Sequence, residues 1–380
     1  MIYFDYNATT PLDADVRRAM LPYLDEVFGN PASVHSVGRH ARAILDDARE
    51  RVANTLGAKP SEITFTSGAT ESNNLAIQGM ARSLRDQGRH LITSAVEHHA
   101  VLHPCEYLAD KEGFALTILP VDREGRVSPD DLRAALREDT ILVSIMAANN
   151  EVGTLQPVTE IGDICRENGV LFHSDAVHCF GKTAFESIHQ FNADLVSICS
   201  HKFHGPKGAG VLFTKSPLQP DPIIHGGSQE HERRGGTENL AAVIGFTEAA
   251  ERFLREPVFR DEQLRPLADR IIALIDRVDG VTFQGSLPNR LCNTVAFSVD
   301  GADSIALLAS LDMAGICASS GSACTSGSVT PSHVLKAMGL SDATSASLVR
   351  LSLGRESTEQ EISELESALP KVVQQIWDAA

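Results

Sequence analysis

The chain has 380 residues, with 33 Lys or Arg against 50 Asp or Glu, which gives a formal net charge of −17. This charge argues against direct nucleic-acid binding and against docking on anionic lipid, because both partners require a surface rich in Lys and Arg. The length suggests two or three domains of ~100–200 residues each. The sequence carries neither a signal-peptide pattern nor a long apolar run, so we expect a cytoplasmic protein without membrane contact.

From about residue 60 to 215 the chain alternates short apolar runs with amphipathic stretches. Helical patterns lie between several of the runs, for example at residues 128–137 and 158–168. The alternation predicts an α/β fold with a mostly parallel sheet and helices on both of its faces. Residues 217–236, rich in Pro, Gly, His and Arg, are predicted to form a long loop. The predicted strands cover residues 62–66, 90–95, 115–121, 140–147, 170–175, 194–200 and 210–215.

After about residue 250 the sequence mixes helical and strand patterns, which predicts a smaller α+β domain. Residues 238–278 are helical with a break expected near Pro257, and the last helix begins at Thr358 with a capping box to Glu361. We therefore expect a large domain at residues 15–250 and a small domain formed by residues 1–14 with 251–380. Further strands are predicted at 281–284, 294–299 and 348–353, and further helices at 304–313 and 331–338.

One candidate anion site follows the first predicted strand, in the motif TSGATESNN that begins at Thr66. Small residues let the backbone approach an anion, the first N–H groups of the next helix point at it, and the hydroxyls of Ser67 and Thr70 add donors. The alternative is an ordinary capped helix.

Two charged residues stand at the ends of apolar strands. Lys202 follows the strand at 194–200 in the motif SHKFHGPKG, and Asp175 ends the strand at 170–175. A desolvated Lys has a lowered pKa and acts as a base or as a nucleophile toward carbonyls, whereas a buried Asp needs a cation. A surface turn for Lys202 and a capping role for Asp175 are the alternatives.

The segment EHHAVLH places His99 and His103 four residues apart, a spacing that can bind zinc on one helix face. The chain shows no HExxH or CxxC motif and no evident third ligand, so we expect no metal. A histidine from this segment that packs on an aromatic ring is the preferred interpretation.

One of the seven cysteines has unusual surroundings. Cys324 lies in SSGSACTSG, whose small residues predict an accessible, mobile loop at about residues 318–330, suited to a nucleophile that travels between partners. An incidental Cys in a Gly/Ser loop is the alternative. Farther along, Arg350 lies in an apolar run, where an inward guanidinium needs a carboxylate from a substrate or from an internal Asp or Glu. The other cysteines are Cys105, Cys165, Cys179, Cys199, Cys292 and Cys317.

An anion site, a strand-end Lys and a strand-end Asp together match the needs of pyridoxal 5'-phosphate, which binds a Lys through its aldehyde and an Asp through its pyridine nitrogen. At this point the sequence resembles the cysteine desulfurases of the NifS/IscS type, in the class-V aminotransferase superfamily of fold type I. The resemblance spans nearly the whole chain and is carried by DYNATTP, SGATESNN, EHHAV, NNEVGT, SHKFHGPKG, RRGGTEN and SSGSACTSG.

The resemblance implies a role for each of these positions. Lys202 would bind the cofactor covalently and move the substrate's Cα proton, Cys324 would be the nucleophile that takes the sulfur, and Arg350 with Asn150 would hold the substrate carboxylate. His98 would stack on the cofactor ring and assist proton transfer. The cofactor-binding set implied is Ala69, Thr70, His98, Asn150, Asp175, His178, Cys199, Ser200, His201, Lys202 and Thr237, with Thr237 reaching the phosphate of the other subunit of a homodimer.

The sequence departs from the family at two positions. His178 stands where the family usually has Gln, and Cys199 where it usually has Ser. An imidazole N–H can replace the Gln amide as a donor to the cofactor's phenolic oxygen, but a thiol is a weaker donor than a hydroxyl. We therefore expect somewhat looser retention of the cofactor.

The function implied is removal of sulfur from L-cysteine to give L-alanine and a persulfide on Cys324, which passes to an acceptor such as an iron–sulfur scaffold. The alternatives are a selenocysteine lyase or another class-V enzyme, a sulfur donor for tRNA or DNA modification, and a sulfur carrier without catalysis.

Overall fold

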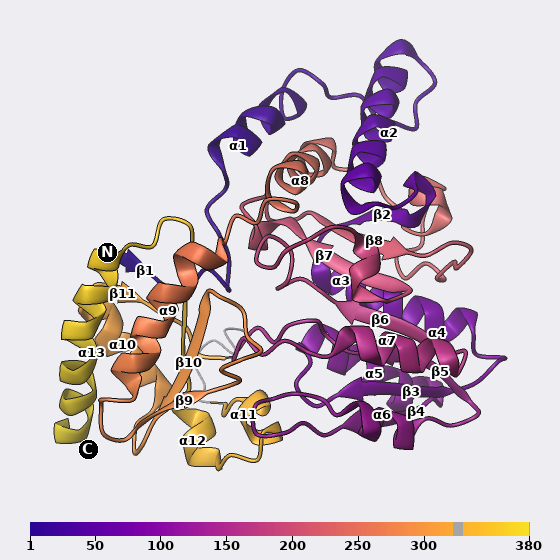
Figure 1. The fold of residues 1–380 in the computed structure, drawn as a ribbon. Coiled ribbons are helices and arrows are strands. Elements are labelled where there is room, and N and C mark those ends of the chain that lie inside the picture. The colour runs from indigo at the N-terminus through magenta and orange to yellow at the C-terminus, as the bar shows by residue number, and fades with distance from the viewer. Residues whose placement is uncertain (322–329, 380) are drawn as a thin grey trace.

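The computed structural model describes residues 1–321 and 330–379. Within these residues seven strands form one sheet in the order β2-β8-β7-β6-β5-β3-β4 (Figure 1). Only β8 runs against its neighbours, so the sheet is mostly parallel, as predicted. The strands are β2 (Ile63–Thr66), β3 (His90–Ser94), β4 (Ala115–Leu119), β5 (Thr140–Ser144), β6 (Leu171–Asp175), β7 (Leu195–Cys199) and β8 (Gly210–Thr214).

All seven predicted strands of this sheet are confirmed, with ends that differ by one to three residues. They could be predicted because the central strands are buried on both faces and therefore read as continuous apolar runs. Strand β5 ends three residues early, since the Met146 N–H donates to the Glu97 carboxylate at 2.9 Å and not to a neighbouring strand.

Helices cover both faces of the sheet (Figure 1). The longest of those around this sheet, α2, packs on α8 and was not among the predicted elements. Its apolar side is built from small residues, among them Ala41, Ala48 and Ala53. These helices are α1 (Ala14–Met20), α2 (Ser36–Leu56), α3 (Ala69–Asn74), α4 (Met80–Ser83), α5 (His99–Glu112), α6 (Pro129–Ala135), α7 (Val158–Glu167) and α8 (Leu240–Phe253), with a π-helical turn (Leu75–Gly79) joining α3 to α4.

Two smaller sheets lie beside the large one (Figure 1). One pairs β9, β10 and β12 antiparallel, and the other pairs β1 with β11, so the first residues of the chain pack against its last third. The predicted strands and helices of this region and the capping box at Thr358 are confirmed. The division into domains at residues 14 and 250 stays a prediction. The elements are β1 (Ile2–Tyr3), α9 (Asp261–Ile275), β9 (Val281–Gln284), β10 (Thr294–Val299), α10 (Ser304–Met313), β11 (Ile316–Cys317), α11 (His333–Ala337), α12 (Asp342–Ala346), β12 (Val349–Ser352) and α13 (Glu359–Ala379).

The predicted long loop at residues 217–236 is confirmed and is fixed to the core by one buried ion pair. Arg49 of α2 donates to Glu230 of the loop at 2.7 Å and to the Ile63 carbonyl at 2.8 Å. Glu230 in turn accepts the Phe65 N–H at 2.8 Å, although its own backbone is left-handed (φ 49°). The pair therefore joins a helix, a strand and a loop at one point.

Replacing Glu230 with Gln should lower the free energy of unfolding by about 3–5 kcal/mol, because it leaves the buried Arg49 charge without its partner. Urea unfolding followed by circular dichroism measures this change. Glu251→Gln is the matched control, since it removes a carboxylate from the exposed pair with Arg51, where the expected loss is below about 1 kcal/mol. Equal losses in the two variants would contradict the role given to Glu230.

Candidate active site

A cavity of about 460 Å³ opens at the carboxyl ends of β6 and β7. This is the edge at which open α/β sheets bind their ligands. Two smaller cavities of about 170 Å³ adjoin it: one shares His98, Asn150, His178 and Lys202 and reaches Arg350, and the other shares Ser67 and Gly208 and reaches Thr237. The predicted site residues that line the large cavity are Ala69, Thr70, His98, Asn150, Asp175, His178, Cys199, His201 and Lys202.

Among the described residues, one predicted site residue, Ser200, does not line these cavities. The Ser200 hydroxyl lies inside the following turn, where it donates to the Pro206 carbonyl at 2.7 Å, so its side chain belongs to the local fold. The resemblance had implied that this residue binds the cofactor. Cys324 lies outside the described residues.

The turn between β2 and α3 forms one wall of the cavity. Gly68 has a positive φ of 150°, which favours glycine. A side chain at residue 210 would come within 2.7 Å of the Gly68 Cα, so β8 approaches this turn closely because Gly210 has no side chain. The Ser67 N–H donates to the Glu71 carboxylate, which also pairs with Arg234 at 2.9 Å. The turn is therefore held in place by its own residues.

Cys199 lies at the end of β7, next to the first residue of α3. Burial raises the pKa of its thiol to about 12, although the Ala69 N–H donates to the sulfur. The thiol is therefore protonated at neutral pH. At the beginning of the helix its sulfur accepts the Ala69 N–H, and its own S–H is a weak donor.

Asp175 ends β6 and faces the same cavity. One of its oxygens accepts from Asn73 Nδ2 at 2.7 Å and the other from the Val177 N–H at 3.1 Å, but across residues 1–321 and 330–379 it forms no ion pair. The capping role is thus real, and the carboxyl group still has lone pairs for a cation in the cavity. Asn73, for which the sequence suggested no role, orients Asp175, while its own Oδ1 is buried without a partner among the described residues.

Lys202 follows β7 and extends toward the first residues of the chain. Its Nζ donates to the Asn7 carbonyl at 2.6 Å and to the Ala8 carbonyl at 2.9 Å. Desolvation by burial, together with the Arg350 charge, lowers the pKa of Lys202. A lowered pKa increases the share of neutral amine, the form that attacks a carbonyl or takes a proton.

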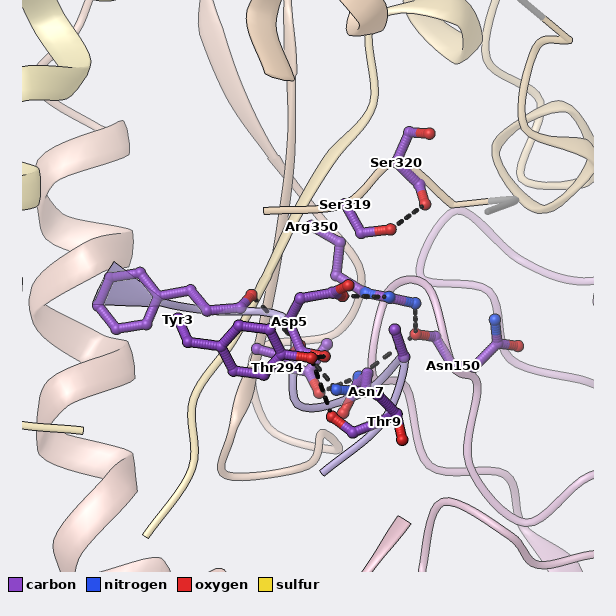
Figure 2. Close-up of polar contacts among 12 residues, drawn as sticks. Tyr3, Asp5, Asn7, Thr9, Asn150, Thr294, Ser319, Ser320 and Arg350 are labelled. Carbon is purple, nitrogen blue, oxygen red and sulfur yellow. Dashed lines mark hydrogen bonds and ion pairs between the residues drawn. The ribbon is translucent and has the colours of Figure 1, made fainter. Parts of the chain in front are cut away.

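Arg350 finds an internal acid, one of the two partners expected for it. Its Nη2 donates to Asp5 Oδ1 and its Nη1 donates to the Asn150 carbonyl, each at 2.9 Å (Figure 2). The Nε of Arg350 is buried and has no partner among the described residues. Asp5 was missed because 345 residues separate it from Arg350, and its only sequence signal is the motif DYNATTP.

His98 and His99 have different surroundings. His98 lines the large cavity and the adjoining cavity that reaches Arg350. Its Nδ1 accepts the Ala100 N–H at 3.0 Å, which leaves Nε2 to face these cavities. His99 stacks on His103 with ring centroids 4.7 Å apart and lies 4.6 Å from the His333 ring. Burial and these neighbouring rings lower the pKa of His99 to about 4. Among the described residues, no group of three His, Cys, Asp or Glu side chains is arranged to hold a metal ion.

Comparison with known proteins identifies the family. The aminotransferase class-V family matches residues 2–365. The cysteine desulfurase IscS of Dictyoglomus turgidum is 46% identical over 99% of this chain and 95% of its own. A solved NifS-like protein superposes with a TM-score of 0.91 at 36% identity over 98% of this chain and 99% of its own.

A third relative was solved as SspA in complex with cysteine, with a TM-score of 0.82 and 36% identity over 94% of this chain and 100% of its own. These matches confirm both the predicted resemblance and the fold type. The chain therefore belongs to the aminotransferase class-V family and, within it, to the cysteine desulfurases.

Proposed function

We propose that this protein is a pyridoxal phosphate-dependent cysteine desulfurase that transfers the sulfur of L-cysteine to Cys324 and releases L-alanine. The observation that carries the proposal is the convergence of Lys202, Asp175 and the start of α3 on one cavity, with Arg350 on the adjoining one. The names of the relatives support the same reaction, and none of those given above is a selenocysteine lyase.

The residues of the large cavity fit pyridoxal phosphate. A volume of about 460 Å³ suits a small cofactor, Asp175 has no ion-pair partner among the described residues, and Lys202 has a lowered pKa. Lys202 would bind the aldehyde, Asp175 the pyridine nitrogen and His98 the ring face. The phosphate would be held by Ala69, Thr70 and His201, with Thr237 supplied by the second subunit of a homodimer and the remaining contacts from Asn150, His178, Cys199 and the Ser200 backbone.

When bound, pyridoxal phosphate supplies an electron sink for the bonds at the substrate's α carbon. Arg350 and Asn150 would orient the substrate carboxylate, and the Lys202 amine would take the Cα proton and return it. The Cys324 thiolate would then attack the substrate sulfur. The C–S bond of cysteine breaks, an S–S bond forms on Cys324, and the carbon skeleton gains the proton that completes L-alanine, so atoms and charge balance.

The persulfide would pass to an acceptor protein, such as an iron–sulfur scaffold, in the cytoplasm. Delivery toward tRNA or DNA modification would use the same persulfide, and direct nucleic-acid contact is not expected at a net charge of −17. Among the described residues no helix is long and apolar enough to cross a membrane.

The purified protein should absorb in the near-visible range and, with L-cysteine and dithiothreitol, release equal amounts of alanine and sulfide. Lys202→Ala should abolish both products, and Cys324→Ala should abolish sulfide release. Cys317→Ser is the thiol control and should keep the parent rate, because Cys317 lines none of the described cavities. A colourless protein, or sulfide release by Cys324→Ala at the parent rate, would refute the proposal.

Cys199→Ser should increase retention of pyridoxal phosphate by about 2- to 10-fold, since a hydroxyl is a stronger hydrogen-bond donor than a thiol. The dissociation constant is measured from absorbance after dialysis at several cofactor concentrations. Cys179→Ser makes the same exchange at a buried position that does not line the large cavity, and it should leave retention unchanged. Equal or weaker retention in Cys199→Ser would count against the contact.

Asp5→Asn should lower the KM for L-cysteine by about 2- to 5-fold, because it keeps the acceptor for Arg350 but removes the charge that competes with the substrate carboxylate. Steady-state sulfide release measures KM and kcat separately. Asp130→Asn removes one charge from an exposed pair with Arg133 on α6 and serves as the control. A KM that is unchanged or raised by Asp5→Asn would show that Asp5 does not compete with the substrate.

A further inference from the structure

His178 and Lys182 lie four residues apart after β6, and both are buried. His178 lines the large cavity and the adjoining cavity that reaches Arg350. Lys182 is not among the described residues that line either of these two cavities. The His178 ring therefore faces both cavities and lies beside Lys182. Lys182 has no role in the mechanism above.

The Lys182 amine is held by groups that leave it little freedom. Its Nζ donates to Asn7 Oδ1, lies 3.4 Å from His178 Nδ1 and is 5.0 Å from the centre of the Phe259 ring. Within the described residues it forms no ion pair with a carboxylate. The amine is thus placed by an amide oxygen, an imidazole nitrogen and an aromatic face.

The orientation of the Asn7 amide is fixed independently. Its Nδ2 donates to Thr294 Oγ1 at 2.9 Å and to the Asn150 carbonyl at 3.3 Å (Figure 2). The opposite oxygen also accepts from Asn293 Nδ2 at 3.2 Å. Asn7 therefore presents its oxygen to Lys182, and the amine must be the donor in that contact.

The contacts of Lys182 also favour one position for the proton of His178. A lysine side chain has at least two N–H donors, and after Asn7 has accepted one, another is available for His178 Nδ1. An imidazole that accepts at Nδ1 carries its proton on Nε2. Burial, followed by the charges of Lys182, Lys202 and Arg350, lowers the pKa of His178 and keeps the ring neutral. Its Nε2 has no hydrogen-bond partner within residues 1–321 and 330–379.

We propose that Lys182 is a positioning residue that fixes His178 as the Nε2–H tautomer, so that the ring donates a hydrogen bond into the cavity, toward the phenolic oxygen of pyridoxal phosphate. The assignment of the tautomer rests on the contacts of Lys182 and Asn7 and on a neutral imidazole, and it does not depend on the cofactor. Only the identity of the acceptor rests on the proposed function. His178 thereby performs with one N–H what a Gln amide can do at this position.

The tautomer is measured by nitrogen NMR on the full-length protein labelled with ¹⁵N-histidine. The signals of His178 are those that disappear in His178→Gln. We expect a pyridine-type shift at Nδ1 and a pyrrole-type shift at Nε2, both before and after removal of pyridoxal phosphate. The opposite assignment, or a doubly protonated ring, overturns the proposal without requiring that any Lys182 variant folds.

Lys182→Met tests the cause of this preference. It keeps the length of the side chain but removes its donors, so the His178 signals should move toward a mixture of tautomers. The dissociation constant of pyridoxal phosphate should rise by about 3- to 10-fold, the value of one hydrogen bond. A tautomer unchanged in Lys182→Met would show that Lys182 does not set it.

The control repeats the Lys182→Met change in the His178→Gln variant. An amide presents its N–H by rotation and needs no neighbour to choose a tautomer, so adding Lys182→Met to this variant should change the dissociation constant by less than about 2-fold. An equal loss in both backgrounds would assign Lys182 a merely structural role. A protein that binds no pyridoxal phosphate refutes the proposed function and leaves the tautomer to the NMR measurement.

Discussion

The site depends on how three cationic side chains share the first residues of the chain. Lys202 donates to the carbonyls of Asn7 and Ala8, Lys182 donates to the Asn7 side chain, and Arg350 pairs with Asp5. Only one of these acceptors carries a charge, so most of the compensation comes from dipoles. Desolvation and the repulsion between these groups and Arg350 then lower the pKa values of both lysines.

The same segment connects the sheets. Strand β1 pairs with β11, the Asn7 N–H donates to Ser352 of β12 at 2.9 Å, and the Asn7 amide bonds to Thr294 of β10. Its carbonyls meanwhile receive Lys202, which follows β7 of the large sheet. A shift of the small sheets would therefore move the groups of residues 5–8 that bind the Lys202 amine and the Arg350 guanidinium. The positions of the Lys202 amine and the Arg350 guanidinium are therefore coupled through one short stretch of backbone, residues 5–8.

Features that leave a local pattern of apolar and polar residues could be predicted from the sequence, whereas contacts between distant residues could not. The seven strands of the large sheet were found because burial on both faces forces continuous apolar runs, and Lys202 and Asp175 were found because polar groups are unusual at the ends of such runs. Helix α2 was missed although Ala41, Leu45, Ala48 and Val52 repeat at helical spacing, since alanines give a weak apolar signal. Asp5 and Asn7 could not be assigned from spacing, because their partners are more than 140 residues away. Ser200 was assigned from the resemblance, and its hydroxyl donates within its own turn, to the Pro206 carbonyl.

The two departures from the family differ in whether a neighbouring residue has to support the changed side chain. Serine and cysteine at residue 199 offer the same single donor at different strength, so no other residue has to change. Glutamine and histidine at residue 178 are not equivalent in this sense. An amide has both a donor and an acceptor and rotates to present the one required, whereas a neutral imidazole has one proton and two nitrogens on which to carry it. A histidine there donates reliably only if a second group holds the other nitrogen, and Lys182 at 3.4 Å is the residue placed to do so. The substitution at 178 is therefore compatible with donation into the cavity because of a lysine that never touches that cavity.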